Sequence, residues 1–101
     1  MNSELRKVIR SVKNVFPVTD MYVFGSYARG EERPDSDLDL LVICSAIPDD
    51  PFDLTYEIRR YLHERIGLAI DVLVTTRIDF EHRRYQPWTV EYTARSEGVV
   101  V

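Results

Sequence analysis

Two aspartates stand at alternate positions where an otherwise apolar strand begins, in the segment SDLDLLVIC over residues 36–44. Branched, apolar residues predict a β-strand over residues 38–44. Because side chains alternate across a strand, Asp37 and Asp39 face one side, while Leu38 and Leu40 pack inward from the other. Two like charges on one face of a strand repel each other. The pair therefore indicates a positively charged partner, of which a divalent metal ion is the simplest.

Helical and strand patterns alternate along the rest of the chain. Apolar residues recur at helical spacing in the predicted helices, and the predicted strands are short apolar runs bounded by turn residues. The expected elements are a helix over residues 3–15, strands over 21–25 and 38–44, a helix over 51–66, a strand over 68–75 and two short helices between 79 and 95. This order predicts an α+β (α/β) fold in which helices cover a small sheet.

Turn and capping residues set the predicted element boundaries. Ser3 is a candidate N-cap for the first helix, and Pro17 prevents the continuation of that helix. Gly25 ends the first strand, and the turn cluster at residues 48–51 ends the second. Within this cluster an Asp-Pro pair starts the next helix, which Gly67 ends.

The composition fits one soluble domain. With 101 residues and 45% hydrophobic content, residues 1–101 are expected to form a single domain with one core. A net charge of −4 argues against direct binding of nucleic acid through a basic surface. The single cysteine, Cys44, cannot form an internal disulfide, and no apolar run approaches the ~20 residues that cross a bilayer. The N-terminal segment lacks a signal-peptide pattern, so we expect a cytoplasmic protein without membrane contact.

A phosphate-binding pattern precedes the paired aspartates. Gly25 lets backbone N–H groups approach a ligand, a helix beginning near Ser26 would add further donors, and Arg29 supplies a guanidinium. A third acid, Asp71, lies inside another apolar strand, and three carboxylates can share two metal ions if the two strands are neighbours. Mg²⁺ commonly takes one or two protein carboxylates, with substrate phosphates and water completing its shell. The sequence therefore predicts a site for a nucleoside triphosphate.

Two better-known motifs fail at decisive positions. The glycines resemble a P-loop in spacing, but Glu31 and Glu32 stand where Lys and Ser/Thr are required. The aspartates imitate the start of an EF-hand loop, but Leu40 replaces its glycine and Ala46 its closing glutamate. The acids alone fit equally well with a polar turn followed by an exposed strand residue, Asp39.

The segments GSYARG (25–30) and SDLDLLV (36–42) together resemble the minimal nucleotidyltransferase domains of the DNA polymerase beta superfamily. Their signature is Gly-Ser, ten residues and Asp-x-Asp, and here Gly25-Ser26 is followed by ten residues and then by Asp37-Leu38-Asp39. The resemblance covers residues 21–75 and places Asp71 where the family has its third carboxylate. It implies a mixed sheet and Mg²⁺-dependent transfer of a nucleoside monophosphate, usually from ATP, with release of pyrophosphate.

The resemblance also implies roles for single residues. Asp37 and Asp39 would hold two Mg²⁺ ions that clamp the triphosphate, and Asp71 would complete the second metal site and help to deprotonate the acceptor hydroxyl. The expected catalytic and metal-binding residues are thus Asp37, Asp39 and Asp71, and the expected nucleotide-binding residues are Gly25, Ser26 and Arg29.

Short chains of this kind resemble the antitoxin half of two-component toxin–antitoxin systems, whose partner is a helical HEPN ribonuclease that becomes adenylylated on a tyrosine. We therefore predict transfer of AMP from ATP to a HEPN toxin. Two alternatives stay open. One is a free-standing transferase that modifies a small molecule such as an aminoglycoside, and the other is a non-catalytic antitoxin that inhibits by binding.

Aromatic and basic residues gather in the C-terminal segment. Such residues are enriched at the centres of protein interfaces, so this segment is expected to contact a partner or a second copy of the chain. The residues concerned are Arg83, Arg84, Tyr85, Trp88 and Tyr92. The alternative is that Trp88 and Tyr92 close the core.

Overall fold

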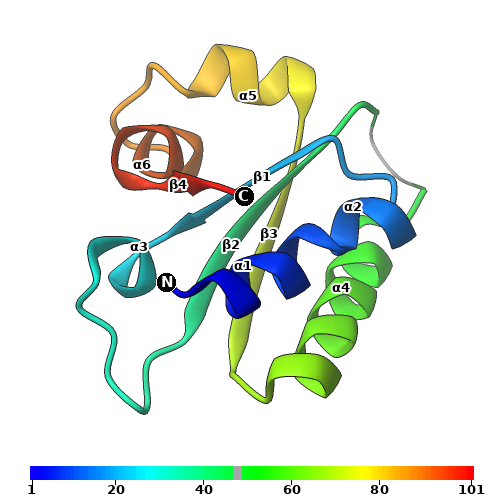
Figure 1. Ribbon diagram of the computed structural model, residues 1–101. Coiled ribbons are helices and arrows are strands. Elements are labelled where there is room, and N and C mark those ends of the chain that lie inside the picture. The colour runs from blue at the N-terminus through cyan, green and yellow to red at the C-terminus, as the bar shows by residue number, and fades with distance from the viewer. Residues whose placement is uncertain (47–48) are drawn as a thin grey trace.

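A four-stranded mixed sheet lies at the centre of the computed structural model, which describes residues 1–46 and 49–101 (Figure 1). Its strands are β1 (Asp20–Phe24), β2 (Leu38–Cys44), β3 (Ile70–Thr76) and β4 (Val99–Val100), in the spatial order β3-β2-β1-β4. β1 runs antiparallel to β2 and β4, whereas β2 and β3 are parallel. The predicted α+β fold with a mixed sheet is confirmed.

Helices cover both faces of this sheet. On one face lie α1 (Ser3–Arg10), α2 (Val12–Val15) and α4 (Pro51–Ile66), and on the other lie α5 (Arg77–Arg83) and α6 (Val90–Glu97) (Figure 1). The short helix α3 (Ser26–Arg29) follows β1 directly. No helix among the described residues is both long enough and apolar enough to span a membrane.

Side-chain alternation along β2 divides the interior into two cores. Leu38, Leu40 and Val42 pack with residues of α1, α2 and α4, while Leu41 and Ile43 pack with residues of α5 and α6. All five side chains are fully buried. β2 therefore carries apolar residues on both faces, and a charged residue in it needs a local reason.

The first helix differs from its prediction in two ways. Asn2, not Ser3, is the N-cap, because its Oδ1 accepts a hydrogen bond from the Leu5 N–H at 2.8 Å. The helix is also interrupted at Ser11, which separates α1 from α2. The Ser11 hydroxyl donates to the Val8 carbonyl at 2.6 Å, and this kind of back-bonding competes with the helical ladder and bends helices.

The later elements follow the predicted boundaries closely. Asp50 caps α4 by accepting from the N–H groups of Phe52 and Asp53, and Gly67 ends it in the left-handed conformation at φ +67°. The two predicted short helices are α5 and α6. Strand β4 was not predicted, because a two-residue strand has no detectable period. The predicted turn at residues 48–51 lies partly outside the described residues.

Candidate nucleotide site

Asp39 and Asp71 occupy facing positions on neighbouring strands. In the parallel β2–β3 pair, Leu38 is opposite Ile70 and Asp39 is opposite Asp71. Leu38 and Ile70 belong to the core beneath α1 and α4, so both aspartates project from the other face. Neighbouring strands lie about 4.8 Å apart. The fold thus brings together two acids that are far apart in the sequence. The two strands that carry them are neighbours, which is the condition stated above for a shared metal site.

Asp37 stands one residue before the start of β2 and is exposed. Asp39 is partly buried and Asp71 is exposed. Burial raises the pKa of Asp39 above its ordinary value of 3.8, the charges of Asp71 and Asp37 raise it further, and Arg29 lowers it. Asp39 is therefore within electrostatic reach of both Asp71 and Asp37.

Gly25 closes one side of this acidic site with its backbone. It has φ +72° and ψ −151°, a combination that is essentially restricted to glycine. A Cβ atom built on Gly25 would lie 2.2 Å from Oδ2 of Asp39. The close approach explains why glycine ends β1, and it puts the Gly25-Ser26 backbone directly beside the carboxylate.

Arg29, the predicted phosphate ligand, is paired with protein carboxylates in this structure. Its Nε lies 3.2 Å from Oε2 of Glu31, and its Nη1 lies 3.1 Å from Oε1 of Glu97 at the end of α6. These are exposed pairs, which contribute little stability. Glu97 was not singled out by sequence reasoning, because no local pattern links residues from α3 and α6.

The donor set fits a divalent cation. Within residues 1–46 and 49–101, no three His, Cys, Asp or Glu side chains are grouped so that they could hold a metal ion. The facing carboxylates of Asp39 and Asp71 still suffice, because Mg²⁺ commonly takes only one or two protein carboxylates. Burial and then the repulsion from Asp71 and Asp37 raise the pKa of Asp39, and a cation there would offset that repulsion. The predicted three-carboxylate site itself stays a prediction.

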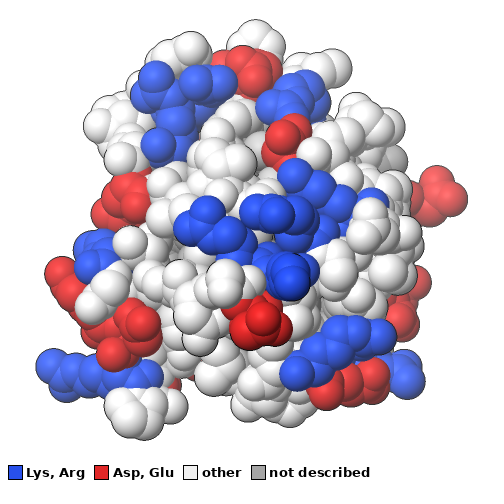
Figure 2. Space-filling model, viewed as in Figure 1, with Lys and Arg blue, Asp and Glu red and all other residues white. Residues whose placement is uncertain are grey.

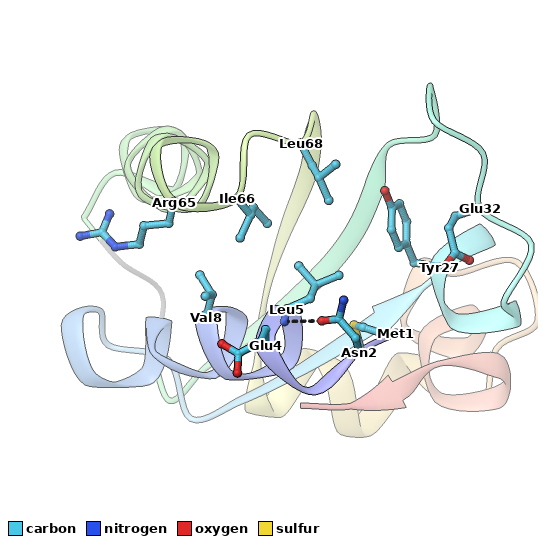
Figure 3. A pocket seen from close by; sticks show the side chains of 10 residues that line it. All are labelled: Met1, Asn2, Glu4, Leu5, Val8, Tyr27, Glu32, Arg65, Ile66 and Leu68. Carbon is cyan, nitrogen blue, oxygen red and sulfur yellow. Dashed lines mark hydrogen bonds between the residues drawn. The ribbon is translucent and has the colours of Figure 1, made fainter.

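A cavity of about 540 Å³ lies elsewhere, between α1, the end of α4 and α3. Figure 3 shows Leu5 and Val8 of α1 pointing toward Ile66 and Leu68, with Tyr27 at one end. None of the three aspartates lines it. We place the chemistry at the carboxylates of Asp39 and Asp71 and not in this cavity, because the two acids that line it, Glu4 and Glu32, lie apart from each other (Figure 3).

The surface charge is unevenly distributed. Figure 2 shows Lys and Arg side chains gathered over α1 and α2, although the chain is acidic overall. The basic residues of this segment are Arg6, Lys7, Arg10 and Lys13. Net charge alone therefore misses a local basic surface, which lies on the face of the sheet opposite Asp39 and Asp71.

The comparison with known families agrees with this geometry. A family model described as the nucleotidyltransferase domain matches residues 5–100. The chain belongs to the nucleotidyltransferase domain family. It is accordingly a nucleotidyltransferase, as the Gly-Ser and Asp-x-Asp segments predicted.

Several proteins resemble this nucleotidyltransferase. It is 30% identical over 93 residues to a "Putative protein adenylyltransferase" of Methanocaldococcus jannaschii, covering 88% of this chain and 90% of the relative. It is 35% identical over 69 residues to the protein adenylyltransferase MntA of Thermococcus cleftensis, covering 68% of each. A crystal structure of a toxin–antitoxin with AMP-PNP shares the fold, with a TM-score of 0.67 at 17% identity over 95% of this chain and 70% of that one.

Proposed function

We propose that this nucleotidyltransferase transfers AMP from ATP to a protein hydroxyl, most specifically a tyrosine of a HEPN-type toxin, and thereby acts as the antitoxin. The observation that carries the proposal is the Asp39–Asp71 pair closed by the Gly25 backbone. Relatives with the name protein adenylyltransferase and a similar toxin–antitoxin fold support the adenylyl group and the protein acceptor.

In this proposal each site residue has a physical task. Asp37, Asp39 and Asp71 would hold two Mg²⁺ ions, which neutralise the charge of the triphosphate when bound. The N–H groups at Gly25 and Ser26 bind the β- and γ-phosphate oxygens. Asp71, whose carboxylate is exposed to an incoming acceptor, takes the proton of the attacking hydroxyl. The hydroxyl oxygen bonds to the α-phosphorus as pyrophosphate leaves.

In the same proposal, Arg29 binds the triphosphate only after it has left its carboxylate partners. Its guanidinium is held by Glu31 and Glu97, and it already lowers the pKa of Asp39. Exposed ion pairs contribute about 0–1 kcal/mol, so a phosphate can displace these carboxylates at little energetic cost. We propose that Arg29 exchanges them for the triphosphate.

The acceptor protein is proposed to contact the α5–α6 region. Tyr85 and Trp88 are exposed, Trp88 by 81%, so Trp88 does not close the core. The guanidinium groups of Arg84 and Arg95 lie 5.3 and 5.2 Å from the Tyr85 ring centre and hold it in place. Rigid aromatic groups beside arginines are typical of interface centres. Cytoplasmic location and a single domain over residues 1–101 stay predictions.

The decisive experiment incubates the chain with Mg²⁺, labelled ATP and a HEPN toxin, and follows label on the toxin and toxin ribonuclease activity together. We expect labelled, inactive toxin with the native chain. Asp39→Asn should abolish labelling, whereas Asp35→Asn, an exposed loop residue outside the site, should not. Inhibition of the toxin without any label would contradict transfer and favour inhibition by binding. Label on an aminoglycoside but not on the toxin would favour the small-molecule alternative.

A further inference from the structure

β3 is a seven-residue outer strand with a free hydrogen-bonding edge. Among the described residues it pairs only with β2. The Leu38 N–H donates to the Ala69 carbonyl at 2.9 Å. This bond shows which alternate residues of β3 direct their backbone groups toward β2. Ala69, Asp71 and the alternate residues beyond them bond to β2, so Ile70, Val72 and Val74 direct their N–H and C=O groups outward. Outside this ladder, the described residues give no hydrogen bond to the backbone of those three.

This edge lacks the usual protection against strand pairing. Natural edge strands are short or carry Lys, Pro or a bulge. The sequence of β3, IDVLVTT, contains neither Lys nor Pro, and Asp71 is its only charge. The opposite edge of the sheet is formed by β4, which is only two residues long. The β4 edge is therefore too short to pair with another strand, whereas the β3 edge, among the described residues, is long enough and free to do so.

Exposed apolar side chains flank the open edge. Phe52 and Tyr56 of α4 are 86% and 56% exposed, Leu73 of β3 is 38% exposed, and Ile78 of α5 is 68% exposed. A hollow of about 420 Å³ joins α4 to the start of β3 through Tyr56 and Ile70. Another of about 370 Å³, lined by Thr76 and Ile78, lies at the strand's other end. Apolar surface of this extent beside a free strand indicates an interface.

The pattern of aromatic and basic residues on α4 favours a second copy of this chain as the binding partner at the β3 edge. Phe52, Tyr56, Arg59 and His63 follow one stripe of the helix, and three of them line or adjoin the hollow beside Ile70. The stripe is aromatic in its first half and basic in its second. A two-fold axis reverses the direction of the helix, so aromatic groups of one copy meet Arg59 and His63 of the other. A parallel arrangement would instead oppose arginine to arginine.

We propose that a second copy of this chain binds at this edge, pairing β3 with β3 in antiparallel fashion about a two-fold axis at Val72. Ile70 then lies opposite Val74 of the second copy, and the outward N–H and C=O groups of both chains are satisfied. This register sets Asp71 opposite Leu73 of the second copy and so avoids opposing Asp71 to itself. The two sheets form one eight-stranded sheet.

The test measures the mass of the purified chain in solution by sedimentation velocity. The native chain should be a dimer. Leu73→Glu places a carboxylate opposite Asp71 of the second copy, where like charges repel, and should give a monomer, while the matched control Val100→Glu, 56% exposed on the opposite edge, should remain a dimer. Circular dichroism checks that each variant is folded. Tyr56→Lys, on the α4 stripe, would face Arg59 of the second copy and should also give a monomer if Leu73→Glu fails to fold.

Amide hydrogen exchange locates the contact independently of the variants. In the native dimer the Val72 and Val74 N–H groups should be protected, and in the monomeric variant they should exchange at least tenfold faster. A native chain that remains monomeric up to millimolar concentration would overturn the proposal. So would a dimer that survives both substitutions, or one in which these two amides exchange as fast as in a monomer.

Discussion

Gly25→Ala should damage the nucleotide site more than the fold. The new methyl group would lie 2.2 Å from Oδ2 of Asp39, well inside contact distance, so the carboxylate must move. The backbone at φ +72° and ψ −151° is also unfavourable for alanine, by about 1–3 kcal/mol. For a domain of this size each kcal/mol shifts Tm by about 4–8 °C. We therefore expect a Tm lower by roughly 4–24 °C, combined with loss of the Mg²⁺-ATP effect on Tm.

A matched control separates backbone strain from the clash. Gly67 also has a positive φ, but a Cβ atom there would meet nothing within 4 Å. Gly67→Ala should lower the free energy of unfolding by about 1–2 kcal/mol through strain alone, and should keep the stabilisation by Mg²⁺-ATP. Both variants and the native chain are compared by thermal denaturation with and without Mg²⁺-ATP.

A double-mutant cycle provides the refutation. Because the clash is with the Asp39 carboxylate, Gly25→Ala should cost less stability in an Asp39→Ala background, with a coupling of at least about 0.5 kcal/mol. If the two substitutions are additive, the proposed contact does not limit stability. If Gly25→Ala retains the full Mg²⁺-ATP response, Gly25 does not close the nucleotide site.

Three further substitutions test other parts of the structure. Asp39→Asn should raise stability to urea at neutral pH and abolish the Mg²⁺-ATP response. Because the folded pKa of Asp39 is raised above 3.8, the destabilisation by this residue begins as pH rises through 3.8 and is complete above the folded pKa, so the gain from Asn should vanish as pH falls below 3.8. Glu91→Ala should cost about 1–3 kcal/mol in urea unfolding, because buried Glu91 accepts from Thr75 and pairs with Arg83. Trp88→Ala should change stability by less than about 0.5 kcal/mol, whereas a core role predicts a loss of about 3–5 kcal/mol in the same assay.

The sequence predicted the acids better than their arrangement. Asp37 and Asp39 are conspicuous because charged residues are unfavourable beside an apolar strand, and Asp71 is conspicuous for the same reason. Their grouping depends on the parallel β2–β3 register, which no local pattern encodes. The pairing of Arg29 with Glu97 likewise joins elements from opposite ends of the chain. Local patterns show which charged residues are unusual for the element that contains them. Tertiary packing decides which of those charged residues become neighbours.

The parallel connection between β2 and β3 has a consequence for the timing of synthesis. Asp39 and Asp71 become neighbours only after the crossover through α4 has closed and β3 has joined the sheet. Gly25 and Asp39 can meet earlier, because β1 and β2 form an antiparallel pair that is close in the sequence. On the ribosome, a nascent chain that has emerged only as far as α4 has one wall of the nucleotide site and lacks the other. Nucleotide binding therefore begins only after β3 has left the exit tunnel.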